Sequence, residues 1–503
     1  LTLNQDERRR FDSCPGSSRR SVTKIVVCNR GATLNSTSER SDGVAAVIVL
    51  AAGGGTRMKS ATSKLLHRVA GRPMLSWAVA AARGLDPENL VVVVGHKRDQ
   101  VEAHLHEDAP DVRTAVQAEQ KGTGHAVACG LDGLGELDGE VVVTYGDVPM
   151  LTGDTLRDLV AAHREQGNLV TVLTADLPDP TGYGRILRDG EKVTGIVEHK
   201  DASEDQLAIT EINSGIYVFD SAALSQGVAQ LSNDNAQGEY YLTDVVTMAA
   251  AGTVSAPGHR GVGAWRTDDL WQTEGVNDRV QLARMNREVN RRIVEKWMRA
   301  GVTIVDPDTT WIQPDVDIEQ DVQIEPGTFL NGATTIRSNS IVGPDCTITD
   351  SEIGHDVVIT RSEVTLTDIA DGARVGPWAN LRPGTMLGSQ TTVGAFTETK
   401  NAQTGRGTAI KRLSYAGDVQ LGDEVTVSAG TVFANNDGVA KQTSTVGDGV
   451  FLSSSTTVVA PVKIESGSFI PAGSVIDAES ASAQDPDDTS DASSDNPTSE
   501  ADL

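Results

Sequence analysis

The stretch I-QPDVD-I-EQDVQ-I-EPGTF-L-NGATT-I-RSNSI-V-GPDCT-I, from Ile312 to Ile348, carries an aliphatic residue at every sixth position. The same spacing returns, after a break in register, in residues 369–393 and 446–470. A six-residue repeat is typical of a parallel β-helix, in which each coil contributes three short strands with one inward aliphatic side chain apiece. Such chains coil to the left, against the usual crossover rule. The repeat therefore predicts a left-handed β-helix over residues 304–476, with loops leaving the coil after Val393 and Val427.

The residues before this repeat have a different sequence pattern, in which short runs of β-branched residues alternate with segments of helical spacing. The runs cover residues 44–52, 89–95, 140–151 and 168–175. Near-continuous apolar runs are typical of buried parallel strands, and their alternation with helices predicts an open, doubly wound α/β sheet. We therefore expect a Rossmann-like domain over residues 43–278 and a linker helix over residues 279–303.

The ends and the overall charge of the chain exclude several classes of partner. The 70 acidic and 43 basic residues give a formal charge of -27, which argues against nucleic acid and anionic membrane as partners. The longest apolar stretch, 44–52, is too short to cross a membrane. Residues 1–42 contain no secretory signal and are expected to be a disordered or spurious extension. Residues 477–503 are acidic and are expected to be a disordered tail.

The cysteines indicate the compartment. Four cysteines are present and form no C-x-x-C pair. Neither a disulfide framework nor a zinc site is suggested, which fits a reducing, cytoplasmic location.

The motif L-A-A-G-G-G-T-R-M, from Leu50 to Met58, closes the first apolar run and is followed by Lys64. Its glycines let the backbone approach a nucleotide and turn amides toward phosphate oxygens. Arg57 and Lys64 supply positive charge where negative charge gathers during transfer. It is neither a Walker loop nor the dinucleotide fingerprint G-x-G-x-x-G. The simpler alternative is that the glycines only turn the chain.

Further motifs follow this one in order. They are Q-A-E-Q-K-G-T-G-H-A (117–126), Y-G-D-V-P-M (145–150), D-P-T-G-Y-G-R-I (179–186), G-I-V-E-H-K-D-A (195–202), E-I-N-S-G-I (211–216), N-A-Q-G-E-Y-Y-L-T-D (235–244) and E-G-V-N-D-R (274–279). With the six-residue repeat, over residues 44–475, they closely resemble the bacterial bifunctional UDP-N-acetylglucosamine pyrophosphorylases/glucosamine-1-phosphate acetyltransferases, which serve cell-wall precursor synthesis.

This resemblance implies a uridylyltransferase that makes UDP-N-acetylglucosamine and pyrophosphate from UTP and N-acetylglucosamine-1-phosphate. It implies catalytic roles for Arg57 and Lys64, and a Mg²⁺ site at Asp147 and Asn277. The implied substrate-binding residues are Leu50, Ala51, Ala52, Gly53, Gln117, Gly122, Thr123, Tyr145, Gly146, Gly184, Glu198 and Asn213. Independently, Asp147 ends an apolar run, and oxygen ligands suit magnesium. Alone, Asp147 could equally be a turn residue at a strand end.

The resemblance is less complete in the repeat domain. It implies an acetyltransferase-like site, with acetyl-CoA and glucosamine-1-phosphate as substrates, in a homotrimer. The matching residues are Arg382, Lys400, Tyr415, Ala429, Asn435, Lys441, Ser454 and Ala472. The family's catalytic histidine, however, is Arg412 here, and an arginine cannot accept a proton. Thr426 and Asn436 also differ from the family, and the acidic tail replaces a basic one. We therefore expect little acetyl transfer.

Alternatives stay open at this point. One is a fully bifunctional enzyme with an altered acetyl site, and another is a non-catalytic sugar-phosphate-binding scaffold. The retained Arg57, Lys64, Asp147 and Asn277 argue against the scaffold. The E-H-K-D and N-A-Q-G-E-Y-Y motifs argue against a thymidylyl- or adenylyltransferase acting on glucose-1-phosphate.

Overall fold

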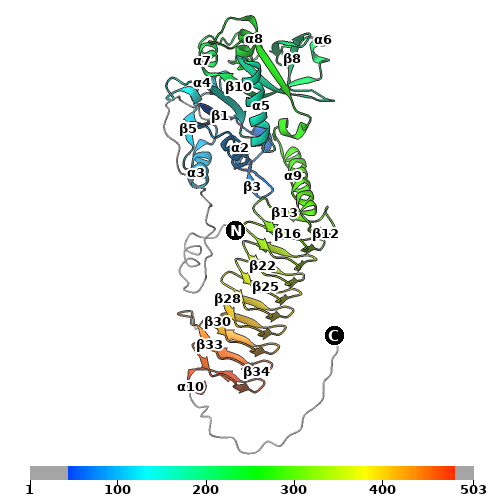
Figure 1. The fold of residues 1–503 in the computed structure, drawn as a ribbon. Helices are drawn as coiled ribbons and strands as arrows, with labels where there is room; N and C mark the ends of the chain where they lie inside the picture. The colour runs from blue at the N-terminus through cyan, green and yellow to red at the C-terminus, as the bar shows by residue number, and fades with distance from the viewer. Residues whose placement is uncertain (1–42, 437, 482–503) are drawn as a thin grey trace, which may run out of the picture. The chain divides into compact units, whose positions relative to one another are not determined.

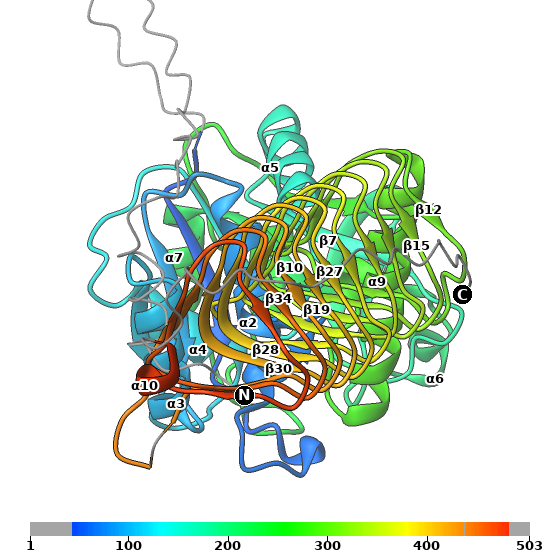
Figure 2. The ribbon, with the colours of Figure 1, turned by 90° about the horizontal axis from the view of Figure 1, so that it is seen from below.

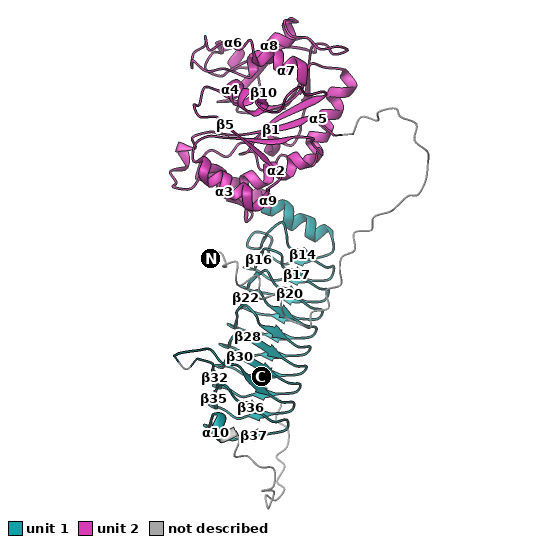
Figure 3. Ribbon diagram, turned by 90° about the vertical axis from the view of Figure 1, so that its left-hand side faces the viewer, with its two compact units in different colours: residues 1–26, 290–503 teal, residues 27–289 magenta. Residues whose placement is uncertain are grey.

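The computed structural model describes residues 43–436 and 438–481, and these form two compact units whose boundary lies between Val289 and Asn290 (Figure 3). The segments 1–42 and 482–503, with most of the predicted tail, lie outside the described residues. The predicted linker segment contains helix α9 (Arg279–Arg299), which runs across the boundary. No helix within the described ranges is long and apolar enough to cross a membrane.

The unit that contains residues 43–289, magenta in Figure 3, comes first in the chain and is called the first unit below. It is built on a mixed sheet with the strand order β11-β7-β10-β6-β1-β4-β5 (Figure 1). These strands are β1 (Ala46–Ala51), β4 (Leu90–Val94), β5 (Arg113–Val116), β6 (Glu140–Tyr145), β7 (Val170–Asp176), β10 (Glu211–Asp220) and β11 (Val262–Arg266). The four predicted apolar runs form β1, β4, β6 and β7. Strand β1 is parallel to both β4 and β6, as predicted, whereas β10 is antiparallel to β6 and β7.

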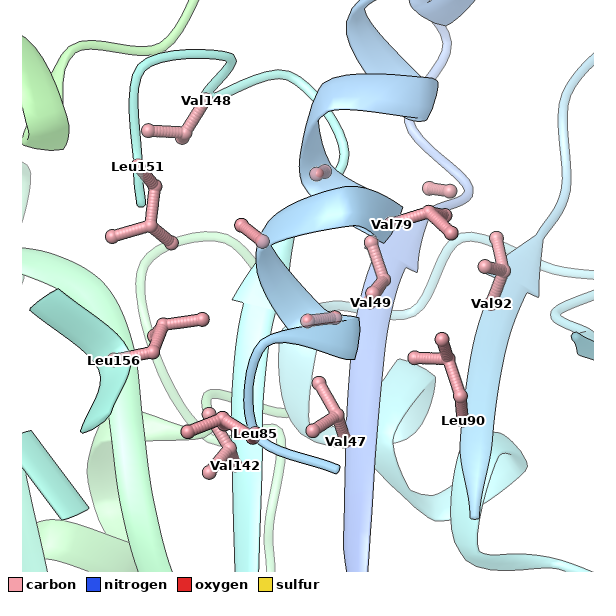
Figure 4. Packing of buried hydrophobic residues seen from close by; sticks show 14 of the residues in the cluster. Val47, Val49, Val79, Leu85, Leu90, Val92, Val142, Val148, Leu151 and Leu156 are labelled. Carbon is pink, nitrogen blue, oxygen red and sulfur yellow. The ribbon is translucent and has the colours of Figure 1, made fainter. Parts of the chain in front are cut away.

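Strand β1 shows why the sheet lies between two layers of helices. Val47 and Val49 face one core, which contains residues of α2, α3 and α5, and Figure 4 shows them beside Val79 and Val92. Ala46 and Ile48 face the other core, with residues of α4, α7 and α8. Because both faces are buried, the strand is apolar throughout. The helices are α2 (Met74–Arg83), α3 (Arg98–Asp108), α4 (Thr123–Leu131), α5 (Gly153–Gln166), α7 (Ser221–Val228) and α8 (Thr243–Ala251).

Smaller elements complete this unit. A hairpin of β8 and β9 pairs with β10 and carries several predicted site residues. The bounds are η1 (Thr56–Met58), η2 (Lys64–Leu66), β2 (Arg68–Val69), β3 (Arg72–Pro73), β8 (Gly184–Asp189), β9 (Lys192–Val197), α6 (Glu204–Leu207) and η3 (Leu270–Thr273).

The second unit is the predicted left-handed β-helix, whose coils lie one behind another in Figure 2. One sheet contains β12 (Thr303–Ile304), β15 (Gln323–Ile324), β18 (Ile341–Val342), β21 (Val358–Ile359), β24 (Arg374–Val375), β27 (Thr392–Val393), β29 (Ala409–Ile410), β31 (Thr426–Val427), β34 (Phe451–Leu452) and β37 (Phe469–Ile470). In both sheets of this unit, each strand is parallel to its counterpart one coil away. In the second sheet, for example, Ile312 pairs with Leu330 and Leu330 with Ile348.

The remaining strands of the coil alternate along a second, folded sheet. They are β13 (Trp311–Ile312), β14 (Asp317–Ile318), β16 (Phe329–Asn331), β17 (Thr335–Ile336), β19 (Thr347–Thr349), β20 (Glu352–Ile353), β22 (Glu363–Thr365), β23 (Asp368–Ile369), β25 (Asn380–Leu381), β26 (Met386–Leu387), β28 (Glu398–Thr404), β30 (Tyr415–Leu421), β32 (Val432–Ala434), β33 (Ser444–Val446), β35 (Thr457–Val459), β36 (Lys463–Ile464) and β38 (Val475–Ile476). A short helix, α10 (Ala478–Ala481), follows.

The predicted break in register is not an interruption of the column. Between Ile348 and Ile369 the buried aliphatic residues on strands are Ile353, Ile359 and Val364, and Ile348 pairs directly with Val364. The coils are shortened there, so the six-residue count fails while the stacking continues.

The prediction of a loop after Val393 is wrong, because the strands of the column continue there. The loop predicted after Val427 is present. Leu381 pairs with Thr399, which is fully buried and fills the inward position. A threonine is not counted in an aliphatic repeat, so the coil was missed there. After β32, by contrast, the chain leaves the column and returns at β33.

A second inward position lies two residues before each aliphatic and is often Thr or Ser. The hydroxyls of Thr328, Thr385 and Thr431 donate to the carbonyls of residues 325, 382 and 428, each at 2.8 Å. Buried hydroxyls must be hydrogen-bonded. These bonds close the corner of each coil.

Candidate functional site

The glycine-rich loop leaves the carboxyl end of β1. Leu50, Ala51 and Ala52 are buried at that end, and Gln120 Nε2 donates to the Ala52 carbonyl at 2.7 Å. A Cβ on Gly53 would meet nothing within 4 Å, so this backbone is open to a ligand. A Cβ on Gly55, whose φ is +58°, would lie 2.8 Å from the Lys64 Cβ. Glycine at this position therefore allows the loop to pass Lys64.

Lys64, Asp147 and Asn277 meet in space although they are far apart in sequence. The Lys64 ammonium bonds the Asp147 carboxylate and lies 3.1 Å from Asn277 Oδ1. The Lys64 and Asp147 side chains are 11% and 19% exposed. The amide of Val276 donates to the Asp147 carbonyl at 2.9 Å, which holds the 275–277 loop in place. Oxygen atoms of Asp147 and Asn277 thus converge on the Lys64 ammonium. Hard oxygen ligands of this kind also fit a divalent metal.

Arg57 lies on η1, in the same loop. Its side chain is exposed, and within the described part of the chain it has no hydrogen bond or ion pair. It is therefore free to contact an anion that enters from solvent.

A second group of predicted residues gathers around the start of α4. Gln117 is 4% exposed, and its Nε2 donates to the Gly122 carbonyl at 3.0 Å. Gly122 has a φ of +102°, and a Cβ there would lie 2.5 Å from the Tyr240 carbonyl oxygen. Thr123 Oγ1 accepts a hydrogen bond from the Leu242 amide at 3.1 Å. These contacts join the Q-K-G-T-G and E-Y-Y-L-T-D motifs.

A cavity of about 250 Å³ adjoins this group. It is lined by Thr123, Tyr145, Gly182, Tyr183, Gly184, Glu198, Asn213, Ser214, Gly215, Tyr217, Gln237, Glu239, Tyr241 and Thr243. Five of the predicted substrate residues are among these: Thr123, Tyr145, Gly184, Glu198 and Asn213. With residues of the 235–244 motif, the structure therefore brings six of the sequence motifs to one cavity.

A bulge in β10 shapes one wall of this cavity. The register against β7 shifts between Asn213 and Tyr217. Within the bulge, Gly215 has a φ of +80°, and a Cβ there would lie 2.4 Å from the Tyr145 ring. Ser214 Oγ donates to the Leu173 carbonyl at 2.6 Å. Glycine at position 215 is required both for the backbone conformation and for space beside Tyr145.

The half-buried carboxyl of Glu198 is one of two carboxyls that line the cavity, the other being that of Glu239. Burial raises the pKa of Glu198, and the charges of Asp201, Asp244 and Glu239 act in the same direction. The hydroxyl of Thr243 donates to Glu198 Oε1 at 3.3 Å and partly offsets that shift.

Sequence reasoning missed several residues that line the cavity. Tyr241 is held by a hydrogen bond from Gln237 Nε2 to its hydroxyl at 2.7 Å, and Gln237 Oε1 accepts from Lys200 at 2.7 Å. The N-A-Q-G-E-Y-Y-L-T-D motif contained Gln237, Tyr241 and Thr243. Motif order alone did not say which members point inward.

The predicted residues of the β-helix form two rows. Burial lowers the pKa of Lys400, and the charges of Lys441 and Arg382 lower it further, so the three cations lie close together. The Tyr415 hydroxyl lies over Gly417, which pairs with Lys400. Asn435 donates to Asp418 one coil away.

The other row follows a different corner of the coil. Backbone bonds join successive coils there: Gly430 N to Arg412 O at 3.1 Å, Ser455 N to Ala429 O at 2.9 Å, and Gly473 N to Ser454 O at 3.0 Å. This corner therefore holds Arg412, Ala429, Ser454 and Ala472.

Comparisons with known proteins agree with the fold. Residues 47–202 match the family described as the MobA-like NTP transferase domain. Relatives named "Bifunctional protein GlmU" match most of the chain. That of Cutibacterium acnes is 70% identical over 78% of this chain and 94% of its own length. Those of Kineococcus radiotolerans and Streptomyces avermitilis are 51% and 52% identical over 86% of this chain, and over 87% and 89% of their own lengths.

Fold and site together define a nucleotidyltransferase domain joined to a left-handed β-helix. With relatives of this identity and coverage, the chain belongs to the family of bifunctional GlmU proteins.

The opposite pKa shifts of two glutamates give a test of the cavity's electrostatics. Because burial raises the pKa of Glu198, its charged form costs folding stability at neutral pH, and Glu198→Gln should raise the midpoint of thermal unfolding at pH 7. The gain should vanish as the pH falls and the carboxyl protonates. Differential scanning calorimetry from pH 4 to pH 8 measures this.

Glu211→Gln is the matched control. Burial would raise the pKa of Glu211, but the two hydrogen bonds and the charge of Arg188 outweigh it and hold the pKa low. Glu211→Gln should therefore lower stability at pH 7, by about 1 kcal/mol, with a loss that shrinks as the pH falls. A loss of stability in Glu198→Gln at pH 7 would contradict the assignment.

Proposed function

We propose that the unit of residues 43–289 transfers the uridylyl group of UTP to N-acetylglucosamine-1-phosphate and releases pyrophosphate. The observation that carries this is the single cavity that brings Thr123, Tyr145, Gly184, Glu198 and Asn213 together. The family supports a nucleotide and a sugar phosphate as substrates. We place this activity in the cytoplasm, with neither nucleic acid nor membrane as partner.

The chemistry requires one bond to form and one to break. A phosphate oxygen of the sugar phosphate attacks the α-phosphorus of UTP, and the bond from that phosphorus to the oxygen bridging to the β-phosphate breaks. No proton moves in this step, so positioning and charge neutralisation dominate. Arg57 and Lys64 supply positive charge to the phosphates.

The substrates would be held by two sets of residues. The end of β1 from Leu50 to Gly53, with Gln117, Gly122 and Thr123, would hold the uridine. Gly184, Glu198 and Asn213 would hold the sugar, beside Tyr145 and Gly146.

Asp147 and Asn277 would hold Mg²⁺. When bound, Mg²⁺ supplies charge neutralisation at the phosphates. Since Lys64 bridges these two residues in the structure, its ammonium would move to a phosphate when both substrates are in place.

This assignment predicts an absolute requirement for a divalent metal. Pyrophosphate release from UTP and N-acetylglucosamine-1-phosphate should stop in excess EDTA and return with Mg²⁺. Asp147→Ala should lower turnover by about 100-fold or more, because it removes a metal ligand. Asp154→Ala, at an exposed side chain on α5, is the control and should leave turnover unchanged. Undiminished turnover in EDTA would refute the proposal.

Acetyl transfer from acetyl-CoA to glucosamine-1-phosphate is a second candidate function. The converging cations Arg382, Lys400 and Lys441 favour it, because they could hold a sugar phosphate. The relatives are named bifunctional proteins, and this name supports two activities. It agrees less well with the single activity that the arginine at position 412 leads us to expect. The amine attacks the thioester carbonyl, the C–S bond breaks and free thiol leaves. Arg412 cannot take the amine's proton, so water or another group must accept it.

Free thiol release tests this second function. We expect release from acetyl-CoA that depends on glucosamine-1-phosphate. If proton transfer limits the rate, Arg412→His should raise it about 100-fold, while Arg406→His, a nearby exposed arginine, should not change it. No thiol release from wild-type protein with full uridylyl transfer would contradict acetyl transfer.

We propose further that the β-helix assembles as a homotrimer. Trp378, Phe396 and Leu413 occupy successive coils and are 55%, 57% and 61% exposed. The Trp378 and Phe396 rings stack with centroids 5.1 Å apart. All three residues have positive φ, an unfavourable conformation for bulky side chains. A strained, exposed apolar ridge indicates an interface.

Light scattering tests the trimer. Wild-type protein should be trimeric at micromolar concentration, and the double variant Trp378→Ser, Phe396→Ser should dissociate. Val305→Ser, at a side chain that is 51% exposed elsewhere in the unit, should stay trimeric. A wild-type monomer would refute the assembly.

A further inference from the structure

Arg185 is a buried charge that the proposed chemistry does not use. It lies on β8 and is only 1% exposed, and it is the largest of the fully buried side chains in the described part of the chain. Among the described residues it forms no ion pair, and its Nε has no hydrogen-bond partner. A buried charge without an anion is costly, which calls for a reason beyond packing.

The contacts of Arg185 point to the cavity wall. Its guanidinium donates to the carbonyl of Tyr183, and to the carbonyl of Leu207 at 3.4 Å. Leu207 ends α6, whose start is fixed by a capping box between Ser203 and Gln206. The guanidinium therefore ties the wall residues 182–184 to a separately anchored helical turn.

Holding the Tyr183 carbonyl orients the whole peptide group between Tyr183 and Gly184. A peptide unit is planar, so a fixed carbonyl also fixes the amide of Gly184. Gly184 has little freedom to adjust, because a Cβ there would lie 3.2 Å from Ile196 and 3.4 Å from Asn213. Both Tyr183 and Gly184 line the cavity.

Tyr183 also lies near the proposed metal ligand. Burial raises the pKa of Tyr183, and the charges of Glu274 and Asp147 raise it further. The segment that lines the sugar cavity therefore also lies within electrostatic range of Asp147. A small shift of this segment would misplace the sugar relative to the phosphate.

We propose that Arg185 is a positioning residue for the sugar phosphate, because it fixes the peptide group between Tyr183 and Gly184. This inference rests on the proposed uridylyl transfer. It predicts that loss of Arg185 weakens the use of the sugar phosphate and spares that of UTP, whose proposed contacts lie on other segments.

Steady-state kinetics of the full chain tests this with Arg185→Met and the control Arg188→Met. Arg188 lies on the same strand and makes two 2.7 Å bonds to Glu211 at the surface, away from the wall. Arg185→Met should raise the KM for N-acetylglucosamine-1-phosphate about tenfold or more and leave the KM for UTP within about twofold. Arg188→Met should leave both within about twofold.

Circular dichroism and UTP-dependent thermal stabilisation show whether each variant is folded. If Arg185→Met does not fold, Arg185→Lys replaces it, because it keeps the charge but lacks the fork that reaches both carbonyls. An unchanged sugar KM in the folded variant, or an equal rise in both KM values, would overturn the inference. A wild-type protein without turnover would instead refute the proposed function.

Discussion

The parallel pairing of β1 with β6 is the constraint on which the first site depends. Leu50 stands opposite Tyr145 in this ladder, so the glycine-rich loop and Asp147 emerge at the same sheet edge. The amide of Gly146 donates to the Leu50 carbonyl at 3.0 Å and extends the pairing to the point where the chains diverge. Lys64 can then reach across to Asp147 and Asn277. Backbone hydrogen bonds thus hold Asp147 beside the glycine-rich loop, and the bond from the Val276 amide to the Asp147 carbonyl brings Asn277 to the same place.

Two groups around this edge are poorly placed for stability. Burial raises the pKa of the Glu198 carboxyl, and Arg185 is a buried cation with an unpaired N–H. A neutral side chain at either position would avoid the cost of burying a charge. They lie around one cavity, whereas the two hydrophobic cores, one on each face of the sheet, are built of buried apolar residues. Such local conflicts are expected where a site requires a particular geometry.

The β-helix was the more predictable unit because each coil contacts only its neighbours. A period visible in the sequence therefore translates directly into stacking, as Ile312, Leu330 and Ile348 show. Prediction failed where the inward residue was not aliphatic, at Thr399, and where a coil was shortened, before Val364. In the first unit the apolar runs located the parallel strands. The antiparallel direction of β10 could not be read from the runs, because pairing direction depends on distant partners.

The proposed site shows the same division. Motifs named the residues at the end of β1 and the pair Asp147 and Asn277, since these follow recognisable turns. They did not identify Tyr183 or Tyr241, because which side chain of a loop faces inward is set by tertiary contacts such as those of Arg185 and Gln237. Periodicity and spacing report local geometry, and a cavity between several segments is not a local property.

The two proposed reactions place different demands on the chain, and this decides what Arg412 can affect. Uridylyl transfer exchanges one phosphorus–oxygen bond for another and needs no proton acceptor, so cations and a metal suffice. Acetyl transfer to an amine produces a proton, and arginine has no lone pair to take it. The replacement of histidine at position 412 therefore bears on the second reaction alone. The cations Arg382, Lys400 and Lys441 would still bind a phosphate, because electrostatic binding is independent of proton transfer. Substrate affinity and turnover of the β-helix are thus separable by measurement, and a site that binds the sugar phosphate without acetylating it would locate the deficit in the acetyl-transfer step.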